Sequence, residues 1–110
     1  MDKVNIADLT EEQISFQLIF HSGSARSKII QALTEYRNNN AEGADELLKE
    51  AKQDLRSAHD IHFQMVKKEA EGTPTALNLL LMHAEDHLMS TVTMKDLVHE
   101  LLELFKSRNI

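Results

Sequence analysis

The sequence contains no cysteine and has only one proline and three glycines in 110 residues. Without cysteine the chain has no disulfides, no thiolate zinc sites and no thiol nucleophile. Any covalent nucleophile must therefore be another residue type. Proline and glycine are typical of tight turns, and so few of them are too few for a chain of many short strands. Helices are the expected structure.

Clusters of positive charge and long apolar runs are also missing. The net charge is −6, and Lys67-Lys68 is the only adjacent basic pair, which argues against a nucleic-acid partner and favours a basic protein partner. No run of about 18 apolar residues is present for membrane insertion, and the N-terminal segment lacks the basic and apolar regions of a secretion signal. A cytoplasmic protein is expected. Hydrophobic residues, at 42%, suffice for the core of one domain over residues 1–110.

Capping signals and periodicity predict three helices, at about 10–38, 41–71 and 74–107. Thr10 and Gln13 form a capping-box pattern at the first start, and Asn40 is a candidate cap for the second helix. Apolar or small side chains then recur at alternating steps of four and three through the second helix: Ala44, Leu48, Ala51, Leu55, Ala58, His62 and Met65. Gly72 is expected to end this helix, with Thr73 capping the third and Pro74 in its first turn. The predicted fold is an all-α, antiparallel three-helix bundle.

The third helix carries more apolar residues than one buried face needs. Its predicted main seam comprises Leu77, Leu80, Ala84, His87, Thr91, Met94, Val98, Leu101 and Phe105. Apolar residues off that seam are Leu79, Leu81, Met82, Leu88, Met89, Val92, Leu97, Leu102 and Leu104. Because each helix of a three-helix bundle keeps an outer face, self-association is expected to bury the surplus.

His83, Asp86, His87 and Ser90 follow one another at helical spacing within this apolar setting. Polar groups near buried surface are costly unless paired, so the cluster is a candidate site, although a histidine on an apolar face is often a satisfied core or interface residue. His59 and His62 fit that structural interpretation, and Arg26 and Lys28 fit surface salt bridges better than a phosphate site.

Two chemistries suit a cluster of His, Asp and His. Residues 83–87 are superficially similar to the H-x-x-E-H pattern of zinc peptidases, but Asp86 replaces the glutamate and the sequence offers no clear third ligand. Nucleophilic phosphoryl transfer fits better, because a neutral imidazole is a competent nucleophile at cytoplasmic pH.

Three motifs in order resemble the lactose/cellobiose-type enzyme IIA of the bacterial sugar phosphotransferase system. Residues 82–89, Met-His-Ala-Glu-Asp-His-Leu-Met, resemble its helix-three signature, and residues 23–28 resemble its G-x-A-R-S motif. Ala58-His59 and residues 69–72 resemble the end of its second helix. The chain departs from the family at His62-Phe63, where relatives usually carry Gln-Thr.

The resemblance implies a homotrimer in which His83 accepts phosphate from the histidine phosphocarrier protein and passes it to the cysteine of enzyme IIB. It implies that His87 supports the phosphoryl group and that the three copies of Asp86 hold one structural divalent ion, commonly Mg²⁺. The sugar would be a disaccharide such as cellobiose, chitobiose or lactose. Two alternatives stay open: a histidine phosphotransfer domain of a signalling relay, and a non-catalytic metal-binding helical scaffold.

Overall fold

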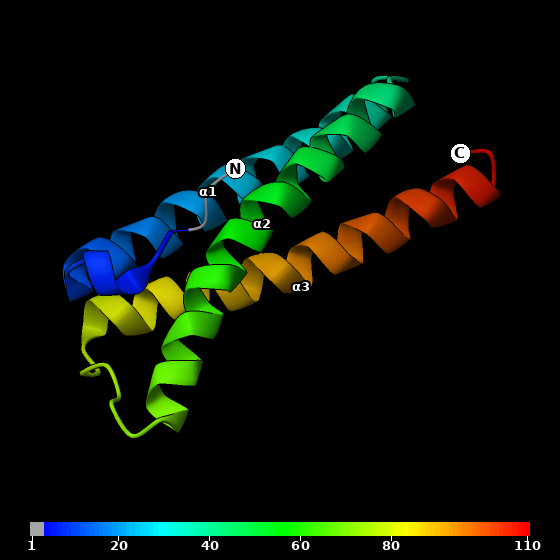
Figure 1. Cartoon of the computed structure of the whole chain (residues 1–110). Coiled ribbons are helices and arrows are strands. Elements are labelled where there is room, and N and C mark those ends of the chain that lie inside the picture. Colours follow the sequence, from blue (N-terminus) through cyan, green and yellow to red (C-terminus); the bar gives the residue numbers. More distant parts are fainter. Residues whose placement is uncertain (1–3) are drawn as a thin grey trace.

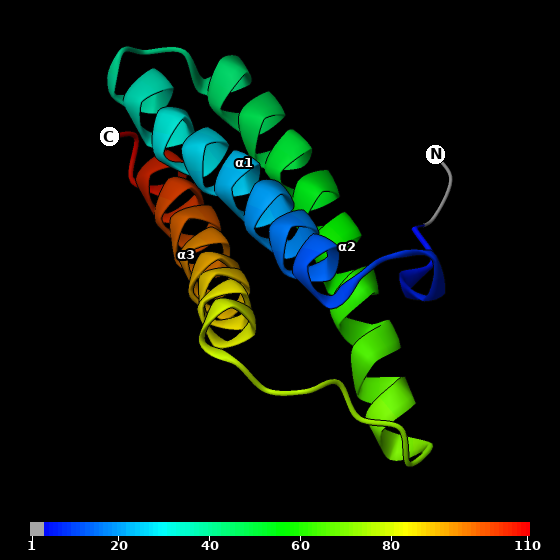
Figure 2. The ribbon, with the colours of Figure 1, turned by 90° about the vertical axis from the view of Figure 1, so that its left-hand side faces the viewer.

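The computed structural model describes residues 4–110, which form a short 3-10 helix and three long α-helices. These elements are η1 (Ile6–Asp8), α1 (Glu11–Arg37), α2 (Ala41–Ala70) and α3 (Leu79–Ser107). Helix α1 packs along both other helices, whereas α2 and α3 make few contacts with each other. Figure 2 shows α1 running between them, and Figure 1 shows the C-terminal part of α2 diverging from α3. Consecutive helices run antiparallel, as predicted, so α1 and α3 run in the same direction.

Side chains cap the N-terminus of each α-helix. The Thr10 hydroxyl accepts from the Gln13 amide at 3.1 Å and the Gln13 side chain accepts from the Thr10 amide at 2.9 Å, which confirms the predicted capping box. Asn40 caps α2 as predicted, its side chain accepting from the Gly43 amide at 3.0 Å. Asn78 caps α3 through the Leu81 amide at 2.8 Å.

All three helices end in a residue with left-handed backbone: Asn39, Gly72 and Asn109. After each of them the chain makes the paired backbone hydrogen bonds of a Schellman motif; in α2, the Gly72 amide donates to Glu69 and the Thr73 amide to Lys68. The predicted end of the second helix at Gly72 is therefore confirmed.

The predicted start of the third helix at residue 74 is wrong, because α3 begins at Leu79. Thr73 does not cap it: its amide and its hydroxyl both donate to the Lys68 carbonyl, at 3.1 Å each, and so complete the end of α2. Pro74 lies in the irregular connection that follows. Figure 2 shows why this connection is needed, since α2 extends well beyond the start of α3 and the chain must return.

The core follows one face of each helix. In α2 the predicted seam is buried except for His62, which is half-buried. In α3 the predicted seam is only partly right. Ala84, Thr91 and Val98 are buried, but Leu101 is exposed and Leu77 lies outside the helix. The core positions that the predicted seam missed are Leu81, Leu88 and Leu102.

Opposite its core face, α3 presents a continuous exposed stripe at steps of three and four residues. The α3 stripe consists of Leu79, Met82, Asp86, Met89, Thr93, Leu97, Leu101 and Leu104. All but Asp86 and Thr93 are large hydrophobic residues, so the predicted surplus of apolar surface is present. Within residues 4–110, no helix has the length and apolar character needed to cross a membrane.

Candidate functional site

His83 lies in the second turn of α3, five residues after the cap Asn78, with its side chain exposed. His87 follows one turn later and is half-buried. The two rings lie edge to face, with 6.2 Å between their centres and 66° between their planes. The structure therefore brings together the two histidines that the sequence analysis singled out.

His87 is held from two sides. Its Nδ1 lies 3.3 Å from the hydroxyl oxygen of Thr91, a fully buried residue one turn further along α3. Its Nε2 faces α1 at Gly23, where an added Cβ would lie 3.9 Å from that nitrogen. The His87 ring is therefore the neighbour of α1 at Gly23.

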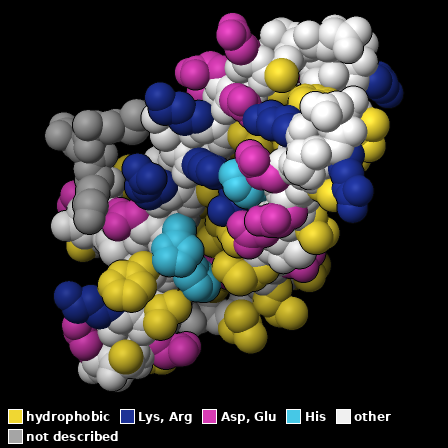
Figure 3. Space-filling view, turned by 90° about the vertical axis from the view of Figure 1, so that its right-hand side faces the viewer, with side chains coloured by type: hydrophobic (Ala, Val, Ile, Leu, Met, Phe, Trp, Pro, Cys, Tyr) yellow, Lys and Arg dark blue, Asp and Glu magenta, His cyan; other side chains and the backbone are white. Residues whose placement is uncertain are grey.

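Helices α1 and α3 both expose large hydrophobic side chains in the part of the sequence that holds the histidine pair and Gly23. Leu79, Met82 and Met89 belong to the α3 stripe, and α1 adds Phe16 and Phe20, which precede Gly23 by two turns and one turn. The two phenylalanines were not singled out from the sequence, since they fall off the helical face that α1 buries. The face of the molecule drawn in Figure 3 likewise carries hydrophobic side chains, with histidine and acidic side chains beside them. Such a surface suits docking of another protein.

Asp86 is exposed and points away from His87, because residues adjacent in a helix are turned by about 100° from each other. No group of three His, Asp or Glu side chains within residues 4–110 is placed to hold a metal ion. Asp86 alone therefore does not form a metal site within one chain.

His59 and His62 form a separate pair on α2, with ring centres 6.0 Å apart. Nδ1 of His62 lies 2.5 Å from a carboxylate oxygen of Glu85, although the two atoms are not aligned for a hydrogen bond. Glu85 and His87 are two positions apart and so point to opposite sides of α3. The α2 histidines thus do not join the His83 cluster. His62 is half-buried, but His59 is exposed and is not a core residue.

Residues 23–28, which resemble the G-x-A-R-S motif, also contribute to a polar cluster between α1 and α2 that the sequence analysis missed. Asp54 accepts from the Ser24 hydroxyl at 2.9 Å and from the Lys28 ammonium at 2.7 Å. Lys28 is therefore in a salt bridge, as expected, and Arg26 is exposed. Burial lowers the pKa of nearby His21, and the Asp54 charge opposes that effect. The sequence contained one sign of this cluster, because the Asp54 carboxylate directly precedes Leu55, a residue of the buried seam.

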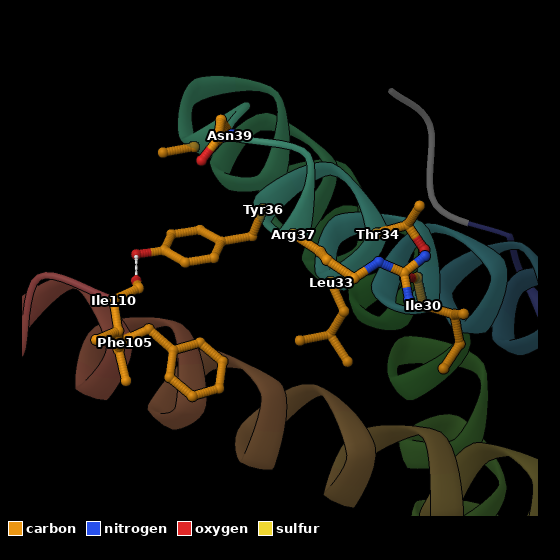
Figure 4. A pocket seen from close by; sticks show the side chains of 9 residues that line it. Ile30, Leu33, Thr34, Tyr36, Arg37, Asn39, Phe105 and Ile110 are labelled. Carbon is orange, nitrogen blue, oxygen red and sulfur yellow. Dashed lines mark hydrogen bonds between the residues drawn. The ribbon is translucent and has the colours of Figure 1, made fainter.

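A pocket lies at the opposite end of the bundle, about 33 Å along α3 from His83. It is lined by the ends of α1 and α3, including Leu33, Tyr36, Arg37 and Phe105. The Tyr36 hydroxyl donates to the Ile110 carbonyl at 2.8 Å across its edge (Figure 4). No residue of the histidine cluster lines this pocket.

Comparison with known proteins links the chain to one family. The family described as "PTS system, Lactose/Cellobiose specific IIA subunit" matches residues 13–106. The oligo-beta-mannoside-specific EIIA component of Bacillus subtilis strain 168 is 61% identical over 110 residues, covering the whole of both chains. The lichenan-specific enzyme IIA component of the same organism is 39% identical over 86% of each chain.

Solved structures agree. The cellobiose-specific enzyme IIA from Bacillus anthracis superposes with a TM-score of 0.85 at 38% identity, over 96% of this chain and 97% of the other. The IIA subunit in a solution structure of the IIA(chitobiose)–HPr complex gives a TM-score of 0.79 at 25% identity, over 93% of this chain and 99% of the other. The architecture and the sequence thus point to the same family.

Proposed function

This chain belongs to the lactose/cellobiose-specific IIA family, whose members are phosphotransferase components, and from that membership we propose that His83 carries the phosphoryl group. The donor would be the histidine phosphocarrier protein HPr, and the acceptor would be the cysteine of the cognate enzyme IIB. The observation that supports the proposal most is an exposed His83 imidazole beside the His87 ring, in a chain without cysteine.

The first step would be an in-line exchange between two histidines. A lone pair on a neutral His83 nitrogen attacks phosphorus, and the bond from phosphorus to the donor imidazole breaks as the new P–N bond forms. Each ring keeps the proton on its other nitrogen, so no proton has to move. In the second step the enzyme IIB thiolate attacks phosphorus and His83 leaves as neutral imidazole. His87 would support the phosphoryl group while it resides on His83.

We propose that three copies assemble through the α3 stripe. A row of exposed Leu and Met side chains along a whole helix is unfavourable in water, and burial yields about 25 cal/mol for each Å² of apolar surface. A three-fold axis along the stripe would bring each copy of α3 next to the other two.

Such an axis would also bring the three Asp86 carboxylates together. Each carboxylate is exposed and lies within an otherwise apolar stripe, so assembly without a counter-charge would be opposed by repulsion. Carboxylate oxygens are the donors that Mg²⁺ prefers, so the residues fit one structural Mg²⁺ per trimer. The ion would neutralise charge at the axis; none of the transfer steps above uses it.

The sugar is expected to be a β-linked oligosaccharide. The full-length identity of 61% to an oligo-beta-mannoside-specific component, against 39% to a lichenan-specific one, supports an oligo-β-mannoside system for this chain. Because the carrier does not bind the sugar, this choice would be expressed through the enzyme IIB that it recognises. The carrier would work in the cytoplasm, on the side where HPr and enzyme IIB meet.

The decisive experiment uses purified HPr, phosphorylated with labelled phosphate, and an enzyme IIB of the oligo-β-mannoside type. Wild type should take up one label per chain and pass it to that enzyme IIB. His83→Ala should take up none, whereas His59→Ala, which changes an exposed histidine outside the cluster, should be labelled normally. Labelling of His83→Ala would disprove the assignment. Faster transfer to an enzyme IIB of the lichenan type would refute the sugar class alone.

A further inference from the structure

The buried hydroxyl of Thr91 lies next to His87, on the side away from Gly23. Thr91 has no exposed surface, and its Oγ1 lies 3.3 Å from His87 Nδ1. Another threonine of this part of α3, the exposed Thr93, behaves in the usual way and donates to the carbonyl of Met89 one turn back, at 3.2 Å. Thr91 instead meets a side chain.

The hydrogen-bonding capacity of the two groups fixes the direction of this bond. A buried hydroxyl has one proton to donate, and a buried donor needs an acceptor. Among residues 4–110, His87 Nδ1 is the acceptor that lies within reach of the Thr91 hydroxyl. If Nδ1 carried a proton it would need to donate to Oγ1, and the hydroxyl proton would then lack an acceptor. The arrangement therefore favours the tautomer of His87 that carries its proton on Nε2.

That tautomer determines what His87 offers to its surroundings. Nε2 lies at the α1 side, near Gly23, and makes no hydrogen bond within the described residues. The 6.2 Å between the ring centres of His83 and His87 leaves room for a phosphoryl oxygen between them. A proton on Nε2 makes this nitrogen a donor to an anion, whereas a proton on Nδ1 would leave a lone pair there, which repels an anion.

We propose that Thr91 is a positioning residue, which holds His87 as the Nε2–H tautomer so that His87 donates a hydrogen bond to the phosphoryl group on His83. The part of this proposal that concerns the phosphoryl group rests on the proposed function. The part that concerns the tautomer does not, because it describes the unphosphorylated protein.

The tautomer is measured first, on the full chain labelled with ¹⁵N, at a pH where imidazoles are neutral. Long-range correlations between ring nitrogens and ring protons distinguish the two tautomers, and a His87→Gln spectrum identifies the signals of His87. Wild type and Thr91→Ser should show the Nε2–H form, because serine keeps the hydroxyl. Thr91→Val, which replaces the hydroxyl with a methyl group, should shift His87 towards a mixture. Thr34→Val, at the far end of α1, is the matched control and should change nothing, because the Thr34 hydroxyl donates to the carbonyl of Ile30, one turn back, at 3.4 Å.

Phosphoryl transfer from labelled HPr is then compared among the same proteins. Loss of one hydrogen bond of ordinary strength corresponds to a decrease of roughly threefold to tenfold in the rate for Thr91→Val. Thr91→Ser should restore most of the rate and Thr34→Val should match wild type. Circular dichroism confirms that the variants are folded, and urea titration corrects for any loss of stability.

Each result has one meaning. A wild-type His87 in the Nδ1–H form, or a tautomer that Thr91→Val leaves unchanged, overturns the role of Thr91. A shifted tautomer with an unchanged transfer rate overturns its link to the phosphoryl group. If wild-type protein takes up no label at all, the proposed function fails, while the tautomer measurement still decides whether Thr91 orients His87.

Discussion

Replacing each of the three glycines with alanine should change stability in a different way, because the structure places them in three different environments. Gly23 lies in the interior of α1, where glycine is about 1 kcal/mol less favourable than alanine. The new Cβ would lie 3.9 Å from His87 Nε2, an ordinary van der Waals contact. Gly23→Ala should therefore raise the free energy of unfolding by about 1 kcal/mol, which corresponds to roughly 4 °C in Tm for a domain of this size.

Gly43 and Gly72 are matched controls for this substitution. A Cβ at Gly43 would overlap the side-chain amide of Asn40, which caps α2 by accepting from the Gly43 amide. Loss of such a cap costs about 1 kcal/mol and should cancel the gain in helix propensity. Gly72 has a φ of 92°, so alanine there should lower the free energy of unfolding by about 1 kcal/mol although no atom lies within 4 Å.

The assay is urea unfolding followed by circular dichroism, with all proteins at one chain concentration because assembly would make stability depend on concentration. The expected order is Gly23→Ala above wild type, Gly43→Ala equal to or below wild type, and Gly72→Ala lowest. A destabilised Gly23→Ala would show that the space between α1 and His87 is tighter than the structure has it. A Gly43→Ala as stable as Gly23→Ala would show that Asn40 does not cap α2.

Three further variants test the core, the α3 stripe and a half-buried histidine. Leu88→Ala removes a fully buried side chain and should cost about 2 to 5 kcal/mol in urea unfolding, whereas Leu77→Ala, exposed in the connection, should cost less than about 0.5 kcal/mol. Met89→Glu should reduce the mass in native mass spectrometry from that of three chains of 12.5 kDa to that of one chain. Val66→Glu, at a similarly exposed position on α2, should leave the mass unchanged. A trimeric Met89→Glu would refute assembly through the stripe. Because burial lowers the pKa of His21 from about 6.5, the unfolded state binds the proton more readily. The contribution of neutral His21 to stability is therefore complete above pH 6.5 and decreases as the pH falls from there towards the folded pKa, and a His21→Gln variant with an equally steep loss below pH 6.5 would contradict this.

The start of the third helix shows where reasoning from the sequence failed. Thr73 and Pro74 form a good start signal on their own, and the sequence analysis assigned them to the third helix. In the structure the amide and hydroxyl of Thr73 both complete the end of α2, so they are not free to cap another helix. Asn78, which precedes three leucines, is the actual cap. A local signal does not reveal which of two neighbouring helices will use it.

The buried face of α3 was difficult to predict for a different reason. Periodicity identifies a buried face only where the opposite face is polar, and α2 satisfies this condition. Its seam was therefore predicted correctly at every position but one, where Ile61 is buried and the predicted His62 is only half-buried. Helix α3 has leucine or methionine on almost every side. The sequence therefore indicated that surplus apolar surface exists, but it did not distinguish Leu88, which is buried, from Leu101, which is exposed.

Helix α3 directs neighbouring side chains to three different surroundings. Because successive residues turn by about 100°, positions 84, 86 and 87 of α3 point in three directions: Ala84 into the core, Asp86 into the α3 stripe and His87 towards α1. His83 lies one turn before His87 and near the edge of the stripe, so assembly through the stripe would leave it beside the subunit boundary. Insertion of one residue between Leu81 and His83 would turn the start of the helix by the same 100° relative to the rest. If Leu81 then stayed in the core, His83 and His87 would be turned away from their present directions. If the histidines stayed in place, Leu81 would leave the core. The directions of the two histidines and of the α3 stripe are thus fixed by the core packing of the helix that carries them, which is why residues 82–89 combine apolar and polar side chains without a spacer.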